Sequence, residues 1–228
     1  MIGGTDVRIE PAPGGATIAP STSLVLGTVG RLLGVGWELE AFYGFAAGDP
    51  VLGPVTRRLA GLRPPLALEP FEALVGAISA QQISLVVAAG VRNRLIRRFG
   101  REVGAAWEFP TEEAVAAADP AELRALGFTQ RKAEYVVELA RSRLPYGELA
   151  TLPDDEVKAR LVAVRGLGAW TADWYLARHL GRPAAWAPGD LAVRKALAFF
   201  YPAGVDVERF EPFQNLAVQY LLAGHRLP

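Results

Sequence analysis

Val164-Arg165-Gly166-Leu167-Gly168-Ala169-Trp170-Thr171-Ala172 decides the fold, because two glycines flank one leucine between two segments of helical spacing. Glycine adopts backbone angles that other residues resist and lets another backbone come close. Leu167 is therefore expected to fill the gap between two helices. The second helix then begins with free N–H groups at residues 168 to 170, which form a seat for a phosphate. Taken alone, Gly-x-Gly is also typical of an ordinary helix end with a tight turn.

The neighbours of this hairpin favour a helix-hairpin-helix, which grips a DNA backbone without reading base sequence. Trp170-Thr171-Ala172 follows the second glycine at once. Pro188-Gly189-Asp190 then brings a carboxylate to the start of another segment of helical spacing. The combination is more specific than either part.

The rest of the chain is mostly of helical spacing. Near the N-terminus, Val7–Glu10 and Ala16–Ala19 are expected to be two short strands, followed by a helix over Leu24–Leu33. Apolar periodicity and Pro, Thr, Asp and Gly boundaries predict the remaining helices: 54–62, one from 70, 84–99, one from 111, one from 119 to before 127, 130–144, 154–164, 169–180, one from 190, and 213–223. The sequence predicts a mainly α protein with a small β-containing N-terminal part.

Composition excludes several classes of function. Of the 228 residues, 51% are apolar, which is enough for two packed lobes. The 24 Lys and Arg balance 24 Asp and Glu, so a polybasic coat for nucleic acid or membrane is not expected, although a local patch is allowed. There is no cysteine, which excludes disulfides, Cys-ligated zinc, iron–sulfur clusters and cysteine nucleophiles. His179 and His225 are the only histidines, too few to favour a His-built zinc site or a Ser-His-Asp triad.

No apolar run reaches the roughly 18 residues of a spanning helix, and the N-terminus lacks a signal-peptide pattern. We therefore expect no membrane association and a cytoplasmic location.

The hairpin and the later aspartate resemble those of helix-hairpin-helix DNA glycosylases, and are most similar to the bacterial DNA-3-methyladenine glycosylase II branch. Further matching segments are Pro70–Val75, Ala77–Ser84, Leu126–Ala133 and Pro188–Lys195. The resemblance covers residues 50 to 222. It implies a mainly α, two-lobed helical fold with a small, shortened N-terminal β-containing part.

The resemblance also implies a division into three parts. Residues 1–45 form the short N-terminal part. Residues 46–70 together with 188–228 form a helical lobe that closes the active-site cleft. Residues 71–187 form a second helical lobe, which carries the helix-hairpin-helix at residues 154–180.

Asp190 takes the position of the family's catalytic carboxylate. An N-cap is the commonest role for an aspartate at a helix start, and position alone favours that interpretation. Breaking an N-glycosidic bond creates an oxocarbenium-like sugar, which a fixed carboxylate stabilises while it orients or deprotonates the attacking water. The helix N-terminus favours the ionised carboxylate that this role needs.

The family's strand-cutting members carry a lysine nucleophile directly before the Thr-Ala of the hairpin, where this chain has Trp170. The only lysines, Lys132, Lys158 and Lys195, stand elsewhere. No Schiff base is expected, so the resemblance implies a monofunctional enzyme without lyase activity.

Trp170 and Trp174 are four residues apart and share one helix face. We interpret them as a π-rich wall for a flipped, cationic base, with packing in the core as the alternative. The family more often has tyrosine at the place of Trp174. Gln81 falls at the family's pocket glutamine, and its alternative is a polar turn between helices.

The predicted DNA contacts lie on the hairpin and the helix that follows: Arg165, Gly166, Leu167, Gly168, Ala169, Thr171 and Arg178. Arg178 is expected to contact phosphate or to pair with a carboxylate. The arginines between residues 92 and 101 spread around their helix and are interpreted as a solvated surface.

No cofactor is required. In the family, backbone carbonyls, here those of Val162, Val164 and Leu167, can hold a sodium or potassium ion beside the phosphate.

Four departures from the family pattern leave the substrate range open. Arg165 replaces the hairpin proline, and Gly189 replaces a second acidic residue. Pro212–Asn215 stands where a Trp-Arg-Ser pattern is common, and Leu222 stands where a pocket tryptophan is often found.

The sequence therefore predicts a monomeric, monofunctional DNA glycosylase that flips and excises alkylated purines of the 3-methyladenine type from double-stranded DNA, which initiates base excision repair. The alternatives are a glycosylase for oxidised or deaminated bases, a non-enzymatic helix-hairpin-helix DNA-binding protein, and a small-ligand helical domain.

Overall fold

The computed structural model describes residues 2 and 4–227. Residues 1, 3 and 228, at the outer ends of the predicted parts 1–45 and 188–228, lie outside the described residues. Along the chain the elements are β1 (Arg8–Ala12), β2 (Gly15–Ala19), α1 (Ser23–Leu32), α2 (Leu39–Ala46), α3 (Leu52–Arg58), α4 (Pro70–Ala80), α5 (Leu85–Phe99), β3 (Arg101–Val103), β4 (Ala106–Glu108), α6 (Glu112–Ala116), α7 (Pro120–Ala125), α8 (Gln130–Ser142), α9 (Tyr146–Leu149), α10 (Asp154–Val162), α11 (Ala169–Tyr175), the π-helical η1 (Leu176–Leu180), α12 (Leu191–Phe200), the 3-10 helix η2 (Val207–Phe210) and α13 (Gln214–Arg226). The predicted mainly α fold is confirmed.

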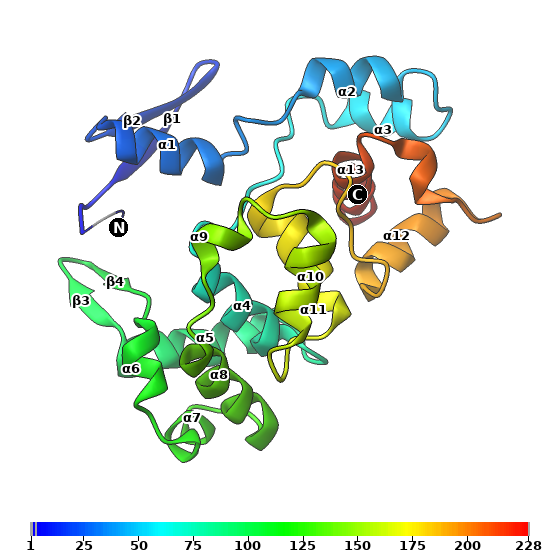
Figure 1. Cartoon of the computed structure of the whole chain (residues 1–228). Helices are drawn as coiled ribbons and strands as arrows, with labels where there is room; N and C mark the ends of the chain where they lie inside the picture. Colours follow the sequence, from blue (N-terminus) through cyan, green and yellow to red (C-terminus); the bar gives the residue numbers. More distant parts are fainter. Residues whose placement is uncertain (1, 3, 228) are drawn as a thin grey trace.

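The expected N-terminal hairpin is present. β1 and β2 pair antiparallel, with Arg8 opposite Ala19 and Ala12 opposite Gly15. Thr22 then caps α1, because its hydroxyl accepts the N–H of Val25. Figure 1 shows this hairpin and α1 together at one end of the molecule.

The helices pack around two hydrophobic clusters. The larger cluster joins buried side chains of α4, α5, α8, α10 and α11, and includes Ile78, Leu161 and Tyr175. The second joins α2, α3, α12 and α13, which Figure 1 shows gathered on one side, and includes Phe42 and Tyr220. Because Phe42 belongs to the second cluster, α2 packs with the lobe predicted to start at residue 46. The three-part division itself stays a prediction.

The sequence analysis missed α2, β3, β4, the short helix α9 and the 3-10 helix η2, and it predicted one continuous helix where α11 is followed by η1. α2 has no side-chain cap at Glu38 and contains Gly44, so it lacked the usual start signal. β3 and β4 form a hairpin of three-residue strands around Gly104, whose φ is +60°. Arg101 and Glu108 pair across it, and nothing in so short a segment stands out from a loop. Strand structure is therefore not confined to the N-terminal part.

The predicted helix over 169–180 is divided. α11 passes directly into the single π turn η1, which ends at Gly181 with a φ of +67°. π turns of this kind often lie at functional sites.

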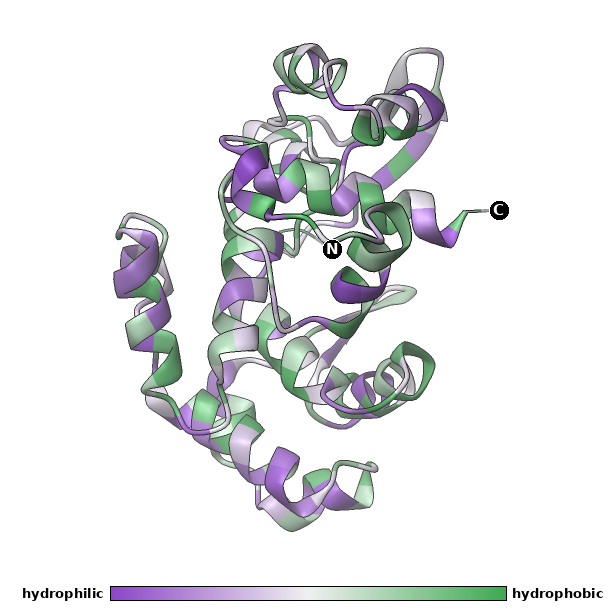
Figure 2. Cartoon of the chain, turned by 90° about the vertical axis from the view of Figure 1, so that its right-hand side faces the viewer, coloured by the Kyte–Doolittle hydropathy of each residue, from purple (hydrophilic) through white to green (hydrophobic). Residues whose placement is uncertain are grey.

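Hydrophobic and hydrophilic residues alternate along the helices in Figure 2, as amphipathic packing requires. Within residues 2 and 4–227, no helix combines the length and hydropathy needed to cross a membrane.

Candidate active site at the hairpin cleft

The hairpin joins α10 to α11 through Gly166, whose φ is +94°. A Cβ at this position would lie 2.6 Å from Cβ and 2.7 Å from Cδ2 of Tyr135 on α8, so a side chain has no room. Leu167 is buried in the larger cluster, as expected for a residue that fills the gap between the helices. Glycine at 166 is therefore required both by its backbone angle and by the approach of α8.

The start of α11 leaves backbone donors free. Among the residues that the structure describes, the N–H groups of Gly168, Ala169 and Trp170 have no acceptor. Gly168 and Ala169 are exposed, whereas the side chain of Thr171 is buried. The prediction that Thr171 contacts DNA therefore does not fit its side chain, which faces the core.

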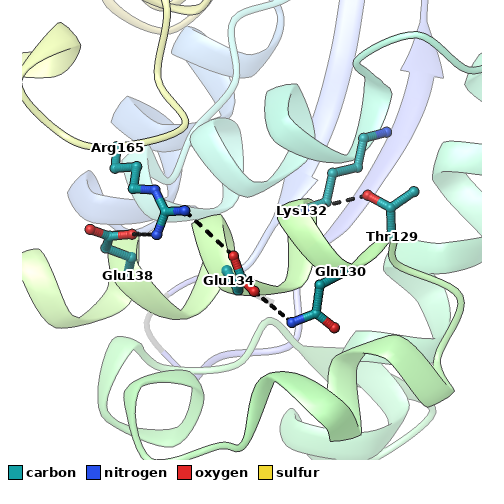
Figure 3. Close-up of polar contacts among 6 residues, drawn as sticks. All are labelled: Thr129, Gln130, Lys132, Glu134, Glu138 and Arg165. Atoms are coloured by element: carbon teal, nitrogen blue, oxygen red, sulfur yellow. Dashed lines mark hydrogen bonds and ion pairs between the residues drawn. The ribbon is translucent and has the colours of Figure 1, made fainter.

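Arg165 does not project freely from the hairpin. Its guanidinium lies 3.4 Å from Glu138 and 3.6 Å from Glu134, and it stacks 5.6 Å above the ring of Tyr135. Figure 3 shows the two ion pairs of Arg165 along α8, where Gln130 also donates to Glu134 and Thr129 caps the helix. Arg165 thus braces the hairpin against α8, and its predicted phosphate contact would require these ion pairs to open.

Asp190 is the N-cap of α12 and also lines the cleft. Its Oδ1 accepts the N–H groups of Ala192 at 2.8 Å and Val193 at 3.2 Å, at the start of α12. Its Oδ2 accepts the indole N–H of Trp170 at 3.3 Å. The two interpretations of this residue therefore coexist, because one oxygen caps the helix and the other faces the hairpin helix.

A cleft of about 570 Å³ opens beside this pair. Its walls come from α4, from α11 with η1, and from α12 and α13 of the opposite cluster. The predicted site residues Asp190, Trp170, Trp174 and Arg178 all line it. The volume is in the range of small-molecule pockets.

Gln81 is not among the residues that line the cleft. Its side-chain amide donates to the carbonyl of Gly166 at 3.3 Å, and its backbone carbonyl accepts from Nζ of Lys132 at 2.6 Å. Gln81 therefore holds the end of α4 against the hairpin. The predicted contact with a base would require its amide to leave Gly166.

Arg178 lies on the cleft wall, where its Nη1 donates to Oε1 of Gln219 at 2.5 Å. Burial lowers the pKa of its guanidinium, and the charge of Arg226 lowers it further. Of the two partners expected for Arg178, the carboxylate is not found, because the amide of Gln219 takes that place, and the contact with phosphate stays a prediction.

Several residues that line the cleft were not predicted from the sequence. One face of α4 with the residue before it lines the cleft at helical spacing: Glu69, Glu72, Ala73, Gly76, Ala77 and Ala80. The small residues at this spacing were a usable signal, because a helix face of alanine and glycine leaves space instead of filling a core. Trp186, Gln219 and Leu222 also line the cleft, and only Leu222 had been considered.

The described residues contain no cluster of three or more His, Asp or Glu side chains that could hold a metal ion. Of the three carbonyls proposed for a monovalent cation, that of Val164 already accepts the N–H of Leu167 at 3.1 Å. A carbonyl has a second lone pair, so this hydrogen bond leaves Val164 able to coordinate a cation, and the sodium or potassium site stays a prediction.

The comparisons agree with this geometry. Residues 75–207, more than half of the chain, match the family model of the HhH-GPD superfamily base excision DNA repair protein. The chain is 30% identical over 164 residues to the DNA-3-methyladenine glycosylase of Bacillus subtilis, covering 68% of this chain and 54% of that protein. It is 30% identical over 177 residues to the DNA-3-methyladenine glycosylase 2 of Escherichia coli, covering 75% and 63%.

The chain thus spans just over half to less than two thirds of the length of these two relatives. The 3-methyladenine DNA-glycosylase of Archaeoglobus fulgidus has a similar structure, with a TM-score of 0.82 and 28% identity over 96% of this chain and 82% of that one. The glycine hairpin, the cleft with Asp190 and the extent of these matches lead to one conclusion: the chain belongs to the HhH-GPD superfamily.

Proposed function

We propose that this chain is a DNA glycosylase that flips an alkylated purine of the 3-methyladenine type out of double-stranded DNA and hydrolyses its N-glycosidic bond. The observation that carries the proposal is the pair formed by Asp190 and Trp170 on the cleft wall. A carboxylate with one oxygen fixed by two backbone N–H groups and the other oriented by an indole N–H is pre-organised.

In this proposal Asp190 stabilises the positive charge that develops on the sugar and orients the attacking water. The indole rings of Trp170 and Trp174 line the same cleft and provide π faces for an electron-poor base. An alkylated base already carries positive charge, so it leaves without a strong general acid.

The free N–H groups of Gly168, Ala169 and Trp170 are the proposed seat for a DNA phosphate. A sodium or potassium ion on the carbonyls of Val162, Val164 and Leu167 would supply further charge beside that phosphate. No cofactor is proposed for the chemical step, and the chain is proposed to act as a monomer.

The apolar start of α5 is the surface proposed to meet the duplex beside the cleft. Leu85 lines the cleft, while Ile83, Val86 and Val87 next to it are exposed, with Val86 at 83%. Exposed apolar side chains at such a position can occupy the gap that a flipped base leaves in the stack.

We also propose that the enzyme lacks lyase activity. Lys132 is held by the carbonyls of Ser79 and Gln81, and Lys158 pairs with Asp173 at 2.9 Å. Lys195 lies on α12, five residues after Asp190, and is exposed. Borohydride treatment during turnover should therefore trap no protein–DNA adduct, and a trapped adduct would refute this part of the proposal.

The test of function is base release from duplexes that carry 3-methyladenine, hypoxanthine or 8-oxoguanine. We expect release of 3-methyladenine to be the fastest. Preferential release of 8-oxoguanine or hypoxanthine would contradict the proposed substrate class but agree with the proposed hydrolysis of the N-glycosidic bond. Salt-dependent duplex binding without release of any base would indicate a non-enzymatic DNA-binding protein.

A further inference from the structure

Glu72 is a second carboxylate on the cleft wall. It lies in the first turn of α4, on the face that also presents Ala73, Gly76 and Ala77 to the cleft. These neighbours are small, so they leave space beside the carboxylate. The side chain is half-buried, and Trp170 and Trp174 line the same cleft.

Glu72 has no structural role that accounts for its position. A glutamate in the third position of a helix commonly accepts the N–H of the N-cap residue in a capping box. α4 has no side-chain cap, and Glu72 makes no hydrogen bond or ion pair within the described part of the chain. Arg92 and Glu69 act on it only through their charges.

Burial raises the pKa of Glu72, and the positive charge of Arg92 partly opposes this rise. Asp190 differs, because backbone and indole N–H groups satisfy its oxygens. A half-buried carboxylate without donors is unfavourable until a cation or hydrogen-bond donor reaches it. The cleft therefore contains an acceptor that the protein itself leaves unused.

The charges of the cleft wall are balanced. The described lining contains the carboxylates of Glu69, Glu72 and Asp190 and the guanidinium groups of Arg92, Arg178 and Arg226. Removing one carboxylate leaves the wall with an excess of positive charge, which repels a cationic base more than a neutral one.

A purine alkylated on a ring nitrogen carries a positive charge, and 3-methyladenine and 7-methylguanine also carry an exocyclic amino group. Hypoxanthine has neither feature. Resting on the proposed function, we propose that Glu72 is a specificity-determining residue, which selects cationic, amino-bearing alkylpurines by accepting a charge-assisted hydrogen bond from the flipped base.

The experiment compares wild type, Glu72→Gln and the control Glu102→Gln under single-turnover conditions. Glu102 is exposed on β3 and does not line the cleft, so its substitution makes the same charge change away from the site. Each protein is assayed on duplexes with 3-methyladenine, 7-methylguanine or hypoxanthine. Binding to a duplex with a tetrahydrofuran abasic site, which lacks a base, is measured in parallel.

We expect Glu72→Gln to slow release of both cationic bases about 10- to 100-fold, the usual effect of losing a charge-assisted hydrogen bond. Release of hypoxanthine and binding to the abasic duplex should change less than about threefold, and Glu102→Gln should change the release of each base and the binding by no more than that.

An equal loss in both variants, a loss of abasic-duplex binding in Glu72→Gln, or unchanged release of the cationic bases would overturn the role of Glu72 while leaving the proposed function in place. Failure of wild type to release any of the three bases would overturn the proposed function itself. Thermal unfolding of each variant checks that the fold is intact.

Discussion

Gly166→Ala is the substitution for which the structure predicts the change in the free energy of unfolding most clearly. Alanine would have to adopt a φ of +94°, which costs about 1–2 kcal/mol in the left-handed region. Its Cβ would also lie 2.6 Å from Cβ of Tyr135, so α8 or the hairpin must move. Overpacking of this kind costs about 1–3 kcal/mol. We therefore expect Gly166→Ala to lower the free energy of unfolding by about 2–5 kcal/mol.

The matched control is Gly168→Ala, two residues further along the same hairpin. A Cβ there meets no atom within 4 Å, and the φ of −94° suits alanine. We expect this variant to change the free energy of unfolding by less than about 1 kcal/mol. Urea unfolding of both variants, followed by circular dichroism, measures the difference. Equal stability of the two variants would refute the reasoning that Gly166 is required by its backbone angle and by Tyr135.

Two further predictions concern Trp170 and His179. Trp170→Phe keeps an aromatic face but removes the N–H that Asp190 accepts, so base release should slow by about tenfold with little change in stability. An unchanged single-turnover rate would show that this hydrogen bond does not position Asp190. Burial lowers the pKa of His179 from 6.5 to about 4, so the unfolded chain binds more protons between these values. Protonation of His179 in the unfolded chain therefore lowers the free energy of unfolding as the pH falls from 6.5 towards 4. At pH 5 the loss is about 2 kcal/mol for this residue alone. Urea unfolding at pH 7.5 and pH 5 should show a smaller loss for His179→Gln than for wild type, and equal losses would contradict the assignment.

The sequence predicted most of this fold because its helix boundaries use standard caps. Thr111, Asp119 and Thr129 each accept a backbone N–H at a helix start where one was expected. The hairpin was predictable for a related reason, because Gly-x-Gly restricts how two helices can be joined. Asp190 and Trp170 then followed from the family pattern, and the structure brings them to 3.3 Å.

The remaining site features depend on contacts between distant segments. Gln81 turns to Gly166, 85 positions away, and Arg178 turns to Gln219 on α13, 41 positions away. No local pattern distinguishes these partners from a phosphate or a base. Glu72 was missed because a glutamate in the first turn of a helix has an ordinary structural explanation, which only the absent hydrogen bond removes.

The most direct test of the central claim is the single-turnover release of 3-methyladenine by Asp190→Asn. Asparagine is as good an N-cap as aspartate, so the variant should keep its stability and its binding to an abasic duplex. We expect the release rate to fall at least about 100-fold, because the negative charge beside the developing sugar cation is lost. Release at the wild-type rate by a folded Asp190→Asn protein would contradict the assignment of Asp190 as the catalytic carboxylate.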